Sequence, residues 1–85
     1  MLKIKVLGPG CPNCKKVEEI TRKAVAGLAV DADIVKITDY AEIITYDVLA
    51  TPGLVINGEV VCSGRIPTDA EVVGWLANAM EGIQG

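Results

Sequence analysis

The chain has 85 residues, of which 51% are hydrophobic, and a formal net charge of −3. This length allows a single small domain, and the hydrophobic content excludes a disordered chain. The acidic balance disfavours binding to the phosphate backbone of nucleic acids. No uncharged stretch approaches the roughly eighteen apolar residues that a membrane span requires, so we expect no insertion into a membrane.

The cysteine and histidine counts limit the chemistry further, because the chain has three cysteines and no histidine. A secreted disulfide framework normally has more cysteines, and Met1 leads directly into "LKIKVL" without the basic and apolar segments of an export signal. We therefore expect a cytoplasmic protein. A closed structural zinc site needs more cysteine or histidine ligands than this chain offers. Without histidine, the usual cysteine or serine nucleophile with a histidine base is excluded.

The first half of the chain predicts two strands and two helices. Residues 2–7, "LKIKVL", alternate apolar and charged side chains as a strand does. Residues 12–28 carry apolar side chains at steps of three and four, which predicts an amphipathic helix. A second strand is predicted at 31–37, and a short helix follows at 39–46 with Asp39 as its N-cap.

The second half predicts a hairpin and a final helix. Strands at 53–57 and 59–63 meet at Asn57-Gly58, a dipeptide that favours a tight hairpin turn. Residues 67–80 form a helix in which Thr68 and Glu71 have the spacing of a capping box. The order βαβαββα predicts an α/β fold, with a four-stranded mixed sheet flanked by three helices in one domain over residues 1–85.

Two cysteines stand between the first strand and the first helix, in "VLGPGCPNCKK". The spacing of Cys11 and Cys14 suits a redox dithiol, half of a zinc or iron–sulfur site, or a clamp for a soft metal. Cys11 is expected at the start of the helix, where unpaired N–H groups, the helix dipole, Lys15 and Lys5 would stabilise a thiolate. Cys14 continues the apolar face, so it should be buried and less acidic. Two unequal thiols are suited to disulfide exchange.

The motifs "KIKVLGPGCPNCKKVEE", "LATPGLVING" and "VVCSGRIPT" give the chain a family resemblance. Over its full length it resembles the small thioredoxin-like proteins known as redox-active disulfide proteins. The resemblance implies a thioredoxin-like fold with a cis-proline and a thiol–disulfide oxidoreductase activity on protein disulfides. It implies that the redox-active pair is Cys11 and Cys14, and that the substrate-binding residues are Gly10, Pro12, Thr51 and Pro52.

The resemblance also implies a disulfide-containing client protein, a thioredoxin-reductase-like partner, no cofactor and a monomer. Three departures from the larger families are visible in the sequence. Gly10 stands where thioredoxins have tryptophan. Ser63-Gly64-Arg65 replaces the double glycine of glutaredoxins, which disfavours glutathione binding and a shared iron–sulfur cluster. Lys5 stands where thioredoxins place a buried carboxylate beneath the second cysteine, so proton transfer from Cys14 cannot follow that route.

A soft-metal module is the alternative interpretation, because "CPNCKKVEE" also resembles the start of heavy-metal-associated domains that carry Cu(I). Those domains have a methionine where this chain has Pro9, end in a strand and lack the Thr51-Pro52 turn. These differences favour the redox function. Cys62 alternates with Val60 and is predicted to be a small inward-facing hydrophobic residue, and Trp75 is predicted at the margin of the core.

Overall fold

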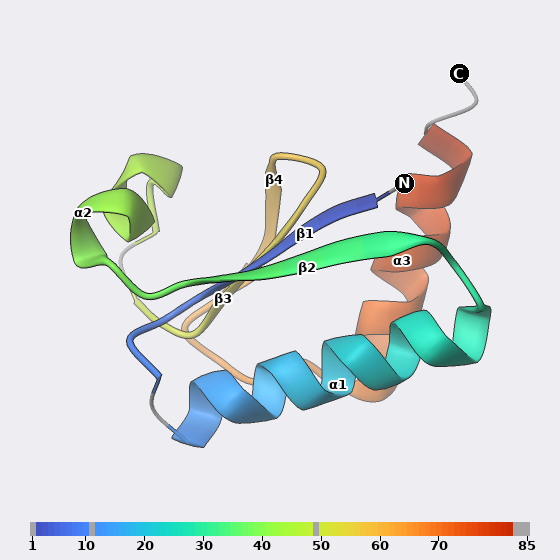
Figure 1. Ribbon diagram of the computed structural model, residues 1–85, viewed down its shortest axis with the longest axis horizontal. Helices are drawn as coiled ribbons and strands as arrows, with labels where there is room; N and C mark the ends of the chain where they lie inside the picture. Colours follow the sequence, from blue (N-terminus) through green and yellow to red (C-terminus); the bar gives the residue numbers. More distant parts are fainter. Residues whose placement is uncertain (1, 11, 49, 83–85) are drawn as a thin grey trace.

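The computed structural model of the chain describes residues 2–10, 12–48 and 50–82. Its order of strands and helices is the predicted βαβαββα. The elements are β1 (Leu2–Leu7), α1 (Pro12–Leu28), β2 (Ala32–Ile37), α2 (Tyr40–Ile43) with the 3₁₀ turn η1 (Ile44–Tyr46), β3 (Gly53–Ile56), β4 (Glu59–Ser63) and α3 (Asp69–Gly82). Figure 1 shows the path of the chain. None of the helices in the described part of the chain is long and apolar enough to span a membrane.

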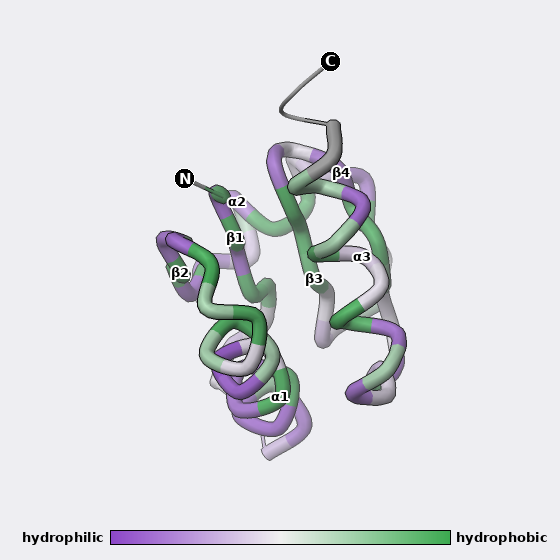
Figure 2. Tube along the Cα trace, turned by 90° about the vertical axis from the view of Figure 1, so that its right-hand side faces the viewer, coloured by the Kyte–Doolittle hydropathy of each residue, from purple (hydrophilic) through white to green (hydrophobic). Residues whose placement is uncertain are grey.

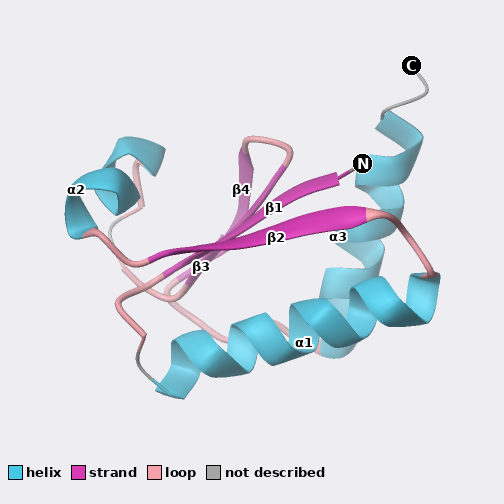
Figure 3. Cartoon of the chain, viewed as in Figure 1, coloured by secondary structure: helices cyan, strands magenta, loops and turns pink. Residues whose placement is uncertain are grey.

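The four strands form one mixed sheet in the order β2-β1-β3-β4. As predicted, β1 and β2 are parallel, whereas β3 runs antiparallel to both β1 and β4 (Figure 3). The register places Val6 beside Lys36 on β2 and beside Leu54 on β3. The end of β1 therefore lies next to the end of β2, and the loop that follows β1 emerges at this edge of the sheet.

The sheet separates two hydrophobic clusters. Helices α1 and α3 pack together over one face, and α2 with η1 covers the other (Figure 1). β3 is mostly apolar, as its largely green colour in Figure 2 shows, and all of its residues are buried. The larger cluster, beneath α1 and α3, is built from Leu2, Ile4, Val6, Val17, Ala24, Leu54, Ile56, Cys62, Val72 and Leu76. The smaller cluster contains Leu7, Ile43, Val48 and Val55.

Strand β4 has a bulge, which changes the face of the sheet toward which its following side chains point. Leu54 pairs with Cys62, but its neighbour Val55 pairs with Val60, so Val61 is the extra residue of a bulge. Val60 packs against the smaller cluster, whereas Val61 and Cys62 pack with the larger one. The predicted inward position of Cys62 is confirmed, but the alternation with Val60 was the wrong reason for it.

Turn and capping residues define where several of the helices and strands end. Asn57 and Gly58 have φ angles of 52° and 83°, as the predicted tight hairpin requires. Asp39 caps α2 by accepting a hydrogen bond from the Ala41 N–H at 3.0 Å. The predicted helix over 39–46 is nevertheless α-helical only over Tyr40–Ile43, because its last turn tightens into η1 before Asp47 takes a left-handed conformation.

Candidate functional site

Three of the predicted site residues lie just before or within the first turn of α1, namely Gly10, Pro12 and Cys14. Gly10 is exposed with φ of 95°, a conformation that favours glycine. Pro12 is the first residue of α1, where its missing N–H costs no helical hydrogen bond, and it is exposed. Cys14 is 5% exposed, as predicted. Cys11 lies outside the described residues, so its position stays a prediction.

Cys14 is buried because of its place on the helix. Val17 and Thr21 follow it at three and seven residues, on the same face, and both are buried. The Thr21 hydroxyl donates to the Val17 carbonyl at 2.8 Å, which satisfies a polar group on the buried face. This face contributes Val17 and Ala24 to the larger cluster, and Cys14 lies at its N-terminal end with its Sγ against Gly8.

Gly8, directly after β1, permits a close approach of Cys14 to the backbone, and this contact was not predicted from the sequence. A Cβ atom at Gly8 would overlap Cys14 Sγ, and it would lie 3.1 Å from Cys14 Cβ and 3.9 Å from Thr51 Cβ. The Gly8 N–H donates to the Ile37 carbonyl at 2.9 Å, which fixes this backbone beside β2. Gly8 therefore brings Cys14 and Thr51 to the same place, although 37 residues of sequence separate them.

The loop before β3 forms the other side of this site. Thr51 is half-buried, Pro52 is buried, and the peptide bond between them is cis. The Pro52 carbonyl accepts a hydrogen bond from the Gly64 N–H at 2.8 Å, and Gly64 has φ of 77°. The turn after β4 is thereby attached to the Thr51-Pro52 loop. The structure thus brings Cys14, Thr51 and Pro52 together at one edge of the sheet.

A cavity of about 50 Å³ adjoins Cys14, and the residues that line it include Gly8, Cys14, Lys15, Glu18, Lys36 and Thr38. The Glu18 carboxylate lies 3.4 Å from Lys36 Nζ and accepts a hydrogen bond from Arg22 Nε at 2.9 Å. The bond from Arg22 lowers the pKa of Glu18. Glu18 and Arg22 are four residues apart on α1, a spacing that favours such an ion pair. The contact with Lys36 and the shared cavity were not predicted.

Lys5 does not face Cys14. Its ammonium donates to the Tyr46 hydroxyl at 2.7 Å and lies 5.4 Å from the centroid of the same ring. This hydrogen bond raises the pKa of Lys5. Tyr46 packs with the smaller cluster, on the face of the sheet that α2 covers, whereas Cys14 belongs to α1 on the opposite face. The charge of Lys5 is therefore directed away from Cys14, and its expected effect on the thiolate of Cys11 stays a prediction because Cys11 lies outside the described residues.

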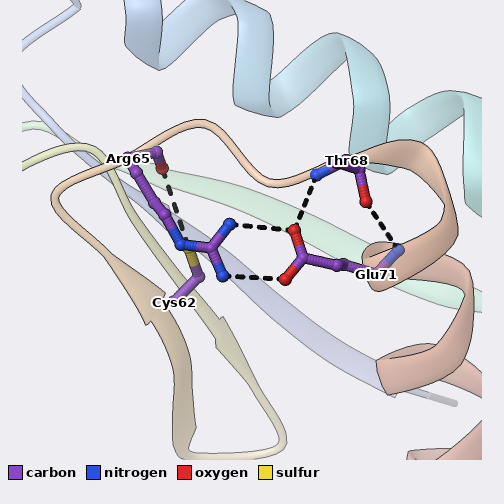
Figure 4. A network of polar contacts seen from close by, with 4 residues as sticks. All are labelled: Cys62, Arg65, Thr68 and Glu71. Carbon is purple, nitrogen blue, oxygen red and sulfur yellow. Dashed lines mark hydrogen bonds and ion pairs between the residues drawn. The ribbon is translucent and has the colours of Figure 1, made fainter.

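Cys62 and Trp75 have the structural positions predicted for them. Cys62 is 7% exposed, and burial raises the pKa of its thiol. Its Sγ donates to the Arg65 carbonyl at 3.6 Å (Figure 4). Trp75 is partly buried against the larger cluster. Across residues 2–10, 12–48 and 50–82, no group of three or more cysteine, aspartate or glutamate side chains could hold a metal ion.

Comparison with known proteins gives the family. The model of the thioredoxin domain matches residues 2–77. A thioredoxin from Methanocaldococcus jannaschii is 40% identical over 82 residues, which cover 96% of this chain and 94% of the relative. A thioredoxin from Methanothermobacter thermautotrophicus is 38% identical over 72 residues, covering 85% of this chain and 94% of the relative. The chain therefore belongs to the thioredoxin-domain family of thiol–disulfide oxidoreductases.

Proposed function

We propose that this protein reduces disulfide bonds of a client protein through a reversible disulfide between Cys11 and Cys14. The observation that carries the proposal is the position of Cys14, which is buried in the first turn of α1 against Gly8 and beside Thr51. A buried thiol in this position is suited to attack a neighbouring sulfur but not a sulfur in solution. Cys11 precedes Pro12, the first residue of the same helix, and is the neighbour that the sequence provides.

In the first step the Cys11 thiolate attacks one sulfur of the client disulfide. A bond forms between Cys11 and that sulfur, the client disulfide breaks, and the second client sulfur leaves as a thiolate. In the second step the Cys14 thiolate attacks Cys11 Sγ and releases the first client sulfur. Two electrons pass to the client, and the protein is left with a Cys11–Cys14 disulfide. A thioredoxin-reductase-like partner then supplies two electrons and two protons to restore both thiols.

The client would bind across the residues that flank Cys14. Gly10 and Pro12 are exposed on the α1 side, and Thr51 and Pro52 form the opposite side. Backbone groups of an extended client segment are the expected partners of these four residues, because none of the four carries a charged side chain. We propose that the protein acts in this way as a cytoplasmic monomer without a bound cofactor.

Trapping of the mixed disulfide tests the proposal. Cys14→Ser keeps the attacking thiol but removes the group that resolves the mixed disulfide, so covalent complexes with client proteins should accumulate. Cys11→Ser should abolish both turnover and trapping. Cys62→Ser is the matched control and should change neither, since Cys62 lies in the larger cluster. Trapping by Cys11→Ser and not by Cys14→Ser would reverse the two roles.

Thiol counting separates the redox function from the soft-metal module. Mild oxidation should leave one free thiol per chain, at Cys62, under denaturing conditions. Three free thiols after oxidation, or a disulfide through Cys62, would reject the proposed pair. Metal removal provides the second measurement: a chelator should leave the melting temperature unchanged. A stoichiometric metal that survives purification and stabilises the fold would favour the metal module instead.

A further inference from the structure

The second step of the proposed reaction needs an acceptor for the proton of Cys14. A thiol attacks as the thiolate, and burial disfavours the charged form, so the proton must leave a buried site at the moment of resolution. Cys14 is 5% exposed and faces the sheet. This inference rests on the proposed function, because it concerns how Cys14 becomes reactive.

Strand β1 offers no acceptor on this face of the sheet. Val6, which lines the cavity beside Cys14, is apolar. Lys5 lies on the opposite face, where its ammonium donates to Tyr46. Among the described residues that line the cavity, the charged side chains come from α1 and β2.

Glu18 meets the geometric requirements. It follows Cys14 by four residues, so the two side chains lie on neighbouring positions of one helix face. Both line the same cavity of about 50 Å³, which has room for a water molecule between them. The Glu18 side chain is 17% exposed, whereas the side chain of its partner Lys36 is 57% exposed. The Glu18 side chain therefore reaches both the cavity beside the buried thiol and the solvent.

We propose that Glu18 relays the proton of Cys14 to solvent during resolution, with Lys36 holding the carboxylate at the cavity. The Cys14 S–H bond breaks, and its proton passes through cavity water to a Glu18 oxygen. The electron pair left on Cys14 Sγ then forms the bond to Cys11 Sγ, and the client sulfur departs with the electrons of the mixed disulfide. Glu18 returns to the carboxylate by releasing the proton to solvent.

The charges around the cavity fit a transient relay. Lys15 and Glu18 come from α1 and Lys36 comes from β2, and Arg22 bonds to the carboxylate oxygen that Lys36 does not contact. These cations keep Glu18 ionised and ready to accept at neutral pH. They also favour rapid loss of the proton once it has been accepted, so that Glu18 is not left protonated between turnovers.

Stopped-flow reduction of dithiobis(nitrobenzoate) isolates the step. Attack by Cys11 releases the first nitrothiobenzoate, and resolution by Cys14 releases the second, so the absorbance rises in two phases. Because this leaving thiolate needs no proton, the second phase reports the deprotonation of Cys14. In Glu18→Gln the second phase should slow at least about tenfold at neutral pH while the first phase is unchanged. Glu19→Gln, the exposed neighbour on α1, is the control and should leave both phases unchanged.

Two further measurements separate a relay from a structural role. The deficit of Glu18→Gln should shrink as pH rises past about 8.5, where hydroxide ionises a thiol without help. In Glu18→Ala, added formate should accelerate the second phase, and it should have no effect on the natural protein. An unchanged second phase in Glu18→Gln, or a deficit that neither pH nor formate relieves, would overturn the relay. Failure to see any second phase in the natural protein would instead overturn the proposed function.

Discussion

No side chain fits at Gly8, because Cys14 Sγ occupies the space that a Cβ atom would need. The predicted position of Cys14 on the buried face of α1 is confirmed, because the apolar residues of this face recur with the helical repeat. No role for Gly8 was predicted from the sequence. The overlap between a Cβ at Gly8 and Cys14 Sγ arises from how α1 packs against the sheet. No local pattern contains that information.

Replacing Gly8 by alanine should destabilise the protein by about 1–3 kcal/mol, because a side chain would be forced into a packed contact. It should also displace Cys14 and slow its resolving step. Chemical denaturation and the two-phase reduction assay measure these effects. Gly27→Ala is the matched control: it lies in α1 with open space around its Cβ direction, and it should stabilise the helix by about 0.5–1 kcal/mol. Equal stability of the two variants would contradict the packing argument.

Cys62 should be an unreactive thiol in the folded protein. Burial raises its pKa and limits access, so little thiolate is present at neutral pH. In a Cys11→Ser/Cys14→Ser variant, alkylation should be slow near pH 8 and should accelerate as pH rises above the pKa of an ordinary cysteine. The same variant in denaturant should react rapidly at pH 8. Similar rates in the folded and denatured protein would show that Cys62 is accessible.

At the scale of elements, helix α1 was more predictable than strand β4, whereas the helix predicted at 67–80 begins and ends two residues later, at Asp69–Gly82. The bounds of α1 match the prediction because Pro12 defines one end and the apolar repeat stops at Leu28, after which Ala29 takes a left-handed conformation. In β4 the run Val60-Val61-Cys62 is apolar throughout, so the sequence does not reveal which residue is the extra one. A bulge is decided by the fit of both faces, not by the strand alone.

The stability that the connection between β4 and α3 contributes should fall in acid. Arg65 donates two hydrogen bonds of 2.8 Å to Glu71, which also accepts from the Thr68 N–H at 3.0 Å in the predicted capping box (Figure 4). The bond from Arg65 is the main cause that lowers the pKa of Glu71 to about 2. The unfolded chain binds the proton more tightly, so this stabilisation is complete above about pH 5 and is lost as pH falls toward 2.

Glu71→Gln should therefore weaken the protein at pH 7 and flatten the loss of stability between pH 5 and pH 2. Urea denaturation at a series of pH values measures both effects. Glu59→Gln, which changes an exposed carboxylate of β4, should keep the acid dependence of the natural protein. An acid response that is the same in Glu71→Gln and in the natural protein would remove Glu71 as its source.

For the whole molecule, the topology was predictable but the composition of the site was not. The element order identified a parallel pair, a hairpin and the edge where the cysteines lie. Glu18 and Lys36 meet because β2 aligns with β1 at Val6 and because α1 turns the face of Glu18 toward that edge. Glu18 and Lys36 are eighteen residues apart on different elements, so no helix or strand repeat in the sequence predicts their contact. The one available signal was that Glu18 follows Cys14 by one helical turn.

Both clusters should unfold together, because β3 belongs to each of them. Leu76→Ala removes a buried side chain of the larger cluster and Ile43→Ala one of the smaller, and each should cost about 2–5 kcal/mol. Val73→Ala, at an exposed position of α3, should cost much less. Fluorescence of Trp75, the single tryptophan, and far-UV circular dichroism should give coincident transitions in every variant. Separate transitions in Ile43→Ala would show that the α2 face unfolds independently.

The direction of β1 has a consequence for how this protein could be joined to others. Leu2 begins the strand at one end of the sheet, Gly8 follows it at the other end beside Cys14, and α3 finishes near the end where β1 starts (Figure 1). An additional domain joined before Leu2 or after α3 would therefore stand away from Cys14. We expect such fusions to leave the thiol reactivity of the chain unchanged, which suits the fold to use as one module of a larger polypeptide.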